Sequence, residues 1–218
     1  MSEQGIDTSV IIDENTVLES AKVTKLNKII NSSSWNEHLE DIMKAWGEKA
    51  AGNREMHDKA AEQFRTFSNK MYVPILCMST LTGVSNFGAA NSQYSEYFMY
   101  GIGSLNIVCA VLTGLLKFLK PDDKAQMHTS VARNFGSFYR QITLELGMTR
   151  EDRSNADELT KWAKTEYDRM QNEAPSIPSN ILKLFKLEHH NQKNLPDIAA
   201  NTYNISIYGR DDDGIQQT

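Results

Sequence analysis

Two kinds of residue pattern are scarce in this 218-residue chain, and their scarcity excludes several classes of protein. It has two cysteines without CxxC spacing, which is too few for a multi-bridge secreted framework and lacks the pattern of a zinc ribbon or redox loop. It also has no long basic block, and its net charge is -5. Because binding to a nucleic-acid backbone relies on clustered Lys and Arg, no nucleic-acid partner is expected.

Motifs that bind phosphate, metal or a catalytic nucleophile are also missing from the sequence. There is no Walker loop, HExxH or GxSxG, and the glycines at Gly101 and Gly103 do not continue into a complete GxGxxG. The five histidines have no metal-ligand spacing apart from the adjacent pair His189 and His190, which is typical of a solvated tail. We therefore expect no catalytic residues, cofactor or metal, and no enzymatic activity.

Charge is missing from two long stretches. Residues 71–95 and 97–116 contain no Asp, Glu, Lys or Arg, although the mean hydropathy of the whole chain is -0.49. A bilayer core of about 30 Å needs roughly 20 helical residues. The pattern predicts transmembrane helices at 71–91 and 97–117; a buried helical hairpin in a soluble protein is the alternative.

Basic residues flank both predicted spans on their outer sides, whereas the connecting loop has none. The positive-inside rule then places both termini in the cytosol. The N-terminal residues have no basic region before an apolar stretch, so no secretory signal is expected. The flanking basic residues are Arg54, Lys59, Arg65 and Lys70 before the first span, and Lys117, Lys120, Lys124 and Arg133 after the second.

The region before the first span is predicted to be a flexible segment, 1–33, with room for a short helix near 16–30, followed by a long helix. Ser34 and Glu37 form a capping-box pattern, so the helix is expected to begin at Trp35 and to run to residue 70. Apolar residues at alternating spacings of four and three predict one packed face, which lines a helical bundle or, alternatively, a two-stranded coiled coil. The main residues of this predicted cytosolic seam are Trp35, Leu39, Ile42, Trp46 and Phe67, with Met56 and Ala60 between them.

Three further cytosolic helices are predicted after the second span, at 122–147, 155–173 and 178–187. Pro121 predicts a bend or a new helix at the membrane surface, because proline suits the first turn of a helix. Residues 188–218 are expected to be a flexible, solvated tail. The predicted fold is all-α, a two-helix transmembrane hairpin with a cytosolic helical bundle formed by the flanking helices.

Polar residues within the predicted spans are candidates for function, because an unpaired polar group is costly in hydrocarbon. They could line a pore or form hydrogen bonds between helices. Pairs of small residues four apart predict close helix packing, and Cys77 and Cys109 are expected to be packing residues. The polar candidates are Thr82, Asn86, Asn106 and Thr113, and the small ones are Ser79, Gly83, Ala110 and Gly114.

Several short motifs resemble the SLATT family of two-transmembrane proteins, over residues 34–186. They are Trp35-x-x-His38-Leu39-Glu40-Asp41, Trp46-Gly47-Glu48-Lys49-Ala50, His57-Asp58-Lys59-Ala60-Ala61, Ser79-Thr80-Leu81-Thr82-Gly83, Asn86-Phe87-Gly88 and Pro175-Ser176-Ile177-Pro178.

The resemblance implies two spans with flanking cytosolic helices, and membrane perturbation or pore formation as the activity. The family includes bacterial effectors of nucleotide-sensing defence systems and members encoded by large DNA viruses, so a host internal membrane or a virion membrane is the implied location. Because two helices cannot enclose a channel, we expect a homo-oligomer in a lipid bilayer. The alternative is a non-conducting structural or adaptor protein, for example of a viral inner membrane, whose cytosolic bundle docks an unidentified protein partner.

Overall fold

A computed structural model describes residues 14–89 and 95–200 of the chain, with side chains at 17–85 and 96–200. The predicted turn near residues 91–96 and most of the predicted tail lie largely outside the described residues. Within them the chain is all-α. The helices are α1 (Glu14–Ser34), α2 (Glu37–Ala89), α3 (Ser95–Leu119), α4 (Pro121–Gly147), α5 (Ala156–Glu173) and α6 (Ser179–Glu188).

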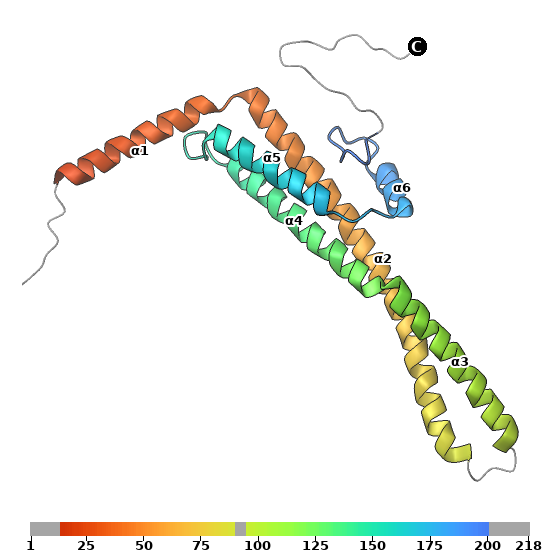
Figure 1. Ribbon diagram of the computed structural model, residues 1–218. Helices are drawn as coiled ribbons and strands as arrows, with labels where there is room; N and C mark the ends of the chain where they lie inside the picture. The colour runs from red at the N-terminus through yellow and green to blue at the C-terminus, as the bar shows by residue number, and fades with distance from the viewer. Residues whose placement is uncertain (1–13, 90–94, 201–218) are drawn as a thin grey trace, which may run out of the picture.

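The long helix α2 runs through both the bundle and the hairpin, and the other helices of these two parts lie along it (Figure 1). α4 runs antiparallel along its first half, and α3 runs antiparallel along its second half. The helix predicted at 35–70 and the span predicted at 71–91 are therefore one continuous helix. Pro74 lies inside it without ending it, which is tolerated where the freed backbone groups find other partners.

The start of α2 differs from the predicted capping box. Asn36 caps the helix, since its Oδ1 accepts a hydrogen bond from the backbone N–H of Leu39 at 2.8 Å. Ser34 instead donates to the carbonyl of Asn31 at 2.8 Å and accepts from the N–H of Ala156 at 3.2 Å. The helix consequently begins at Glu37, and Trp35 is buried in the short link between α1 and α2.

The predicted bend at Pro121 is confirmed as a break between α3 and α4. Lys120 has φ 46° and ψ 55°, and Pro121 begins the new helix. A left-handed conformation costs a lysine roughly 1–2 kcal/mol, because its Cβ crowds the following carbonyl oxygen. The following proline disfavours the right-handed helical conformation for Lys120, so α3 does not continue through this residue.

The first core lies where α2, α4 and α5 pack together. Phe135, Phe138 and Ile142 of α4 are almost completely buried, as is Met43 of α2. The aromatic rings of Phe138 and Trp162 stack with their centroids 5.4 Å apart. Offset aromatic and aliphatic packing of this kind holds the three helices as one bundle.

A second core joins α2 to α6 and to the segment that follows it. Met56 and Ala60 of α2 are buried with Phe185 and Ala199. This corrects the prediction of a solvated tail from residue 188, because residues 195–199 turn back onto α2. The prediction failed because the segment has turn residues and no helical periodicity, and its packing depends on a non-local partner.

α1 occupies most of the segment predicted to be flexible. Figure 1 shows it extending from the end of the bundle that lies opposite the α2–α3 hairpin. It is held near its C-terminal end by Asn31, whose amide donates to the carbonyl of Arg153 at 3.0 Å, and by an ion pair between Lys28 and Asp152. Its large apolar side chains are about half exposed: Val17, Leu18, Val23, Leu26, Ile29 and Ile30.

Candidate functional site

The second half of α2 and all of α3 form a hairpin whose contact face repeats every seven residues. We call the less exposed residues of this face the hairpin seam. Alternating spacings of three and four residues keep one stripe of each helix directed at its partner, as in a coiled coil. The hairpin seam consists of Ser68, Met71, Ile75, Met78, Thr82 and Ser85 of α2 and Ile102, Leu105, Cys109, Leu112 and Leu116 of α3.

The outer surface of the hairpin is apolar and exposed. One helical stretch among the described residues, within Glu96–Gly147, is long and apolar enough to cross a membrane, with a mean hydropathy of 1.9 and only 11% of its best window buried. A core helix of a soluble protein would be mostly buried, so the low burial favours contact with lipid. The charge-free half of α2 is not long and apolar enough by the same measure, so it stays a prediction that this half crosses a membrane.

Large apolar side chains are exposed on both helices of the hairpin, however. On each helix, several of these residues have more than half of their surface accessible. They include Tyr72, Val73, Leu76, Leu81 and Val84 of α2 and Tyr97, Met99, Tyr100, Ile107, Val111 and Phe118 of α3. In water such a continuous apolar surface would be a site of association.

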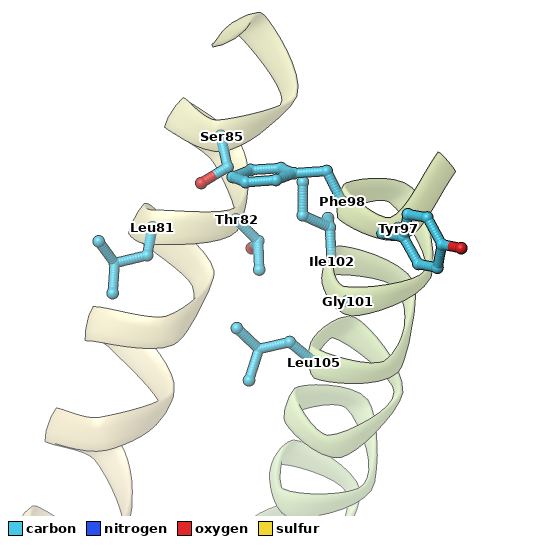
Figure 2. A pocket seen from close by; sticks show the side chains of 8 residues that line it. All are labelled: Leu81, Thr82, Ser85, Tyr97, Phe98, Gly101, Ile102 and Leu105. Carbon is cyan, nitrogen blue, oxygen red and sulfur yellow. The ribbon is translucent and has the colours of Figure 1, made fainter. Parts of the chain in front are cut away.

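An open groove of about 370 Å³ lies between the two helices near the tip of the hairpin. Figure 2 shows the ring of Phe98 reaching toward Ser85 and Thr82, with Leu105 nearer the base of the groove. The lining is mainly apolar, and its polar side chains are Thr82, Ser85 and Tyr97, of which the Tyr97 hydroxyl points away from α2 (Figure 2). The hairpin is therefore loosely packed at this end.

Among the described side chains, the predicted polar residues Thr82, Asn106 and Thr113 form no hydrogen bond with one another. The Thr82 hydroxyl is buried and donates to the carbonyl of Ser79 at 3.0 Å, and the Thr113 hydroxyl donates to that of Cys109 at 2.7 Å. Both hydroxyls are thus satisfied within their own helices. Asn106 is exposed, away from the hairpin seam, and the side chain of Asn86 lies outside the described residues.

The predicted small residues do not pack between α2 and α3. Ser79, Gly83, Ala110 and Gly114 are all exposed, and a Cβ added at Gly83 or Gly114 would meet nothing within 4 Å. On α3, Ala110 and Gly114 share a helix face with Asn106 and Gly103, because 100° per residue brings positions three, four and seven apart into one stripe. We call these four residues the α3 stripe, and it flanks the hairpin seam.

Of the predicted cytosolic seam, four residues lie against the first core. Trp35 is buried, and Leu39, Ile42 and Trp46 are partly buried there. Phe67 is 39% exposed and does not pack against either core of the bundle.

The buried face of α2 is wider than the predicted seam. The predicted positions Met56 and Ala60 are buried, and so are Met43, His57 and Ser68, each of which follows a predicted position by one residue. Asn53 of α2 is buried as well, and its amide donates to the phenol oxygen of Tyr167 at 3.3 Å.

An ionic cluster fixes the end of the bundle farthest from the hairpin. Glu40 accepts hydrogen bonds from Arg150 at 2.8 and 2.9 Å and from Arg153, and these guanidinium groups lower the pKa of Glu40 to about 2. The Arg153 guanidinium also lies over the ring of Trp35, 5.1 Å from its centroid. The indole N–H of Trp35 donates to the carbonyl of Ser154 at 3.0 Å.

One group of side chains has the composition of a metal site, but a lysine already neutralises it. The ligand atoms of Glu55, Glu188 and His189 lie within 4.8 Å of one another. The ammonium of Lys59 contacts the Glu55 carboxylate at 2.9 Å and also that of Glu188. Because this ammonium provides the positive charge between the carboxylates, we do not assign a metal here.

Comparison of the chain with protein-family models, with curated proteins and with solved structures gave no match.

Proposed function

We propose that this chain is an integral membrane protein whose α2–α3 hairpins assemble into an oligomer that forms a pore or perturbs the bilayer, under the control of the cytosolic bundle. The observation that carries the proposal is the exposed apolar surface of the hairpin, which contrasts with the charged surface of the bundle. Burying a large apolar side chain completely contributes about 1.5–3 kcal/mol. Lipid provides this burial on every side of the hairpin.

The position of Asn106 supports assembly. It lies midway along α3 on an exposed face, where the hydrocarbon of a bilayer offers its amide no hydrogen-bond partner. A partner helix from another copy can supply one, and such a bond contributes roughly 1 kcal/mol. Oligomerisation is also required for conduction, because a single pair of helices encloses no channel.

The small residues around Asn106 favour the same interface. Gly103, Ala110 and Gly114 give the α3 stripe a low profile, so that a second helix can approach the backbone closely. Open space surrounds both Gly103 and Gly114 in the monomer. A ring of hairpins packed through this stripe would place Asn106 at the interface or facing an aqueous lumen.

The bundle and the hairpin are joined by two short, structured connections. α2 runs through both parts as one helix, while α3 and α4 are separated by the single non-helical residue Lys120. A change in the packing of α4 against α2 is therefore expected to alter the angle of α3. This connection is the route by which we propose that the bundle controls the hairpin.

Leakage from liposomes tests the proposal. Purified protein should release an encapsulated dye and dissipate an ion gradient, and Asn106→Leu should reduce both while cross-linking still detects oligomers. Val108→Leu is a matched control, because Val108 is exposed on another face of α3. A wild-type protein that inserts and does not leak contradicts conduction, and full leakage by Asn106→Leu removes this residue from the lumen.

A non-conducting adaptor is the second candidate, and α1 is the observation that favours it. Six large apolar side chains of this helix are exposed at the end of the bundle away from the hairpin. A protein partner could cover them without any role for a lumen. The liposome experiment separates the two candidates, because an adaptor inserts and does not leak.

A further inference from the structure

Two buried histidines face each other between α2 and α4. The Nδ1 atoms of His57 and His128 are 2.8 Å apart, and each residue is 2% exposed. The pair joins α2, which continues into the hairpin, to α4, which follows α3 after the single residue Lys120. It belongs to no site described above.

Aromatic rings enclose the pair. The ring of Phe135 stacks against His57, and the ring of Phe64 stacks against His128, with centroid distances of 6.0 and 5.6 Å. These rings exclude water and have no oxygen or nitrogen atom that could accept a hydrogen bond from an imidazolium N–H. Burial therefore lowers the pKa of both histidines, that of His57 to about 4.

The ionisable groups of α2 and α4 around the pair do not compensate a positive charge. On α2, Arg54 and Asp58 pair with each other at the surface, with Nε and Oδ2 3.6 Å apart. On α4, the ammonium of Lys124 lies over the Phe64 ring, 5.7 Å from its centroid, and adds a further positive charge.

The remaining elements of the bundle supply no compensating anion either. The α5 phenol of Tyr167 bonds Asn53 and Gln171, and the link 174–178 has no ionisable side chain. Glu188 of α6 is paired with Lys59. Among the described residues, no carboxylate is bonded to either imidazole.

The contact between the rings depends on how many protons they carry. A hydrogen bond between two Nδ1 atoms needs one N–H donor and one bare nitrogen acceptor. A neutral pair satisfies this with opposite tautomers. One added proton leaves the bond in place and buries an uncompensated charge, and a second proton leaves two N–H groups pointing at each other.

We propose that His57 and His128 form a pH-sensitive latch that holds α2 and α4 together while the pair is neutral and releases them in acid. The inference does not depend on whether the hairpin conducts. Histidines that are harder to protonate in the closed state than in the open state stabilise the closed state above pH 6.5. This stabilisation is lost as the pH falls from 6.5 toward 4, since the open state binds more protons in that interval.

The junction next to the latch is suited to opening. The hydroxyl of Ser68 is buried without a hydrogen-bond partner among the described residues, and Lys120 has a strained, positive φ. Both features weaken the closed arrangement locally. Release of α4 from α2 is therefore expected to begin between the histidines and Lys120.

Hydrogen exchange on the full-length protein in lipid nanodiscs tests the latch. Peptides from residues 57–70 and 121–135 should exchange faster in acid, after correction for the intrinsic dependence of exchange on pH. A change in pKa from 6.5 to about 4 for His57 alone predicts about 30-fold more opening at pH 5 than at pH 7.5. Peptides around the Glu40 cluster should not show this change.

A double variant gives the decisive comparison. His57→Leu with His128→Leu removes both partners and leaves an apolar contact, so these peptides should stay protected at pH 5. The control His190→Gln, which replaces an exposed histidine, should keep the acid response. If the double variant does not fold, the wild-type profile still decides: equal protection at pH 7.5 and pH 5 would overturn the latch, as would an unchanged acid response in a folded double variant.

Discussion

Gly52 on α2 is the position where one added methyl group has the clearest structural consequence. A Cβ at this residue would lie 2.6 and 2.8 Å from Cγ and Cδ of Pro196 and 3.1 Å from the ring of Phe185. Contacts below 3.0 Å cannot persist, so either the segment around Pro196 or α2 must move. α2 is held here by its packing against α4, and we expect the segment to yield.

Two opposing effects set the magnitude for Gly52→Ala. Alanine stabilises a helix interior relative to glycine by about 1 kcal/mol. Overpacking a buried contact costs about 1–3 kcal/mol, and Pro196 and Ala199 are completely buried. The helix therefore keeps its gain while the docked segment loses about 1–3 kcal/mol, which corresponds to about 5- to 150-fold more frequent opening.

Hydrogen exchange resolves these two effects because it reports each segment separately. The amides of Ala199 and Ala200, which donate to the carbonyl of Pro196 at 2.8 and 2.9 Å, should exchange faster in Gly52→Ala. Gly147→Ala is the control, since a Cβ there meets nothing within 4 Å, and it should leave the segment unchanged. Unchanged protection of Ala199 and Ala200 in Gly52→Ala would refute the proposed docking of residues 195–199 onto α2.

Two further predictions concern the stability of the bundle. In chemical denaturation, Phe135→Ala should lower the free energy of unfolding by about 3–5 kcal/mol, because Phe135 is fully buried. Phe67→Ala, at a position that is 39% exposed, should lower it by less than about 1 kcal/mol. Equal losses in the two variants would place Phe67 in the core. The Glu40 carboxylate has its pKa lowered to about 2, so it should contribute stability above pH 4.5 that is lost as the pH falls toward 2. In Glu40→Gln, the melting temperature should therefore depend less steeply on pH in that interval. An equally steep dependence in the variant would assign the acid sensitivity to other groups.

The sequence was sufficient to predict the helical segments of the bundle closely. The helices predicted at 122–147, 155–173 and 178–187 are found within one residue of those bounds. Proline, asparagine and glycine mark these ends through local effects, such as the cap in which Asn155 accepts from the N–H of Asp157. Local chemistry of this kind can be read from neighbouring residues alone.

The buried face of α2 could not be predicted as well, because its position depends on the partners. The predicted repeat stays near the core at Leu39 and Trp46 and has turned away from it at Phe67. Buried polar residues such as Asn53 and His57 also interrupt the apolar pattern. Their partners, Tyr167 and His128, are distant in sequence, so a pattern along one helix contains no sign of them.

The candidate site was predicted only in part for a related reason. The polar and small residues of the hairpin can be identified from composition, but their pattern does not show which of them face α2, α3 or the surroundings. Thr82 lies on the hairpin seam, whereas Asn106 and Gly114 lie outside it. The rotation of each helix about its axis decides which residues face the partner helix, and composition alone does not determine this rotation.

The membrane topology of the hairpin is the central claim, and cysteine labelling in intact cells tests it most directly. In a background of Cys77→Ala and Cys109→Ala, a membrane-impermeant maleimide should react with Ser92→Cys. It should react with Ser33→Cys and Ser206→Cys only after the cells are permeabilised. Labelling of either flanking probe in intact cells, or recovery of the protein in the soluble fraction, would contradict a hairpin that enters the bilayer from the cytosol.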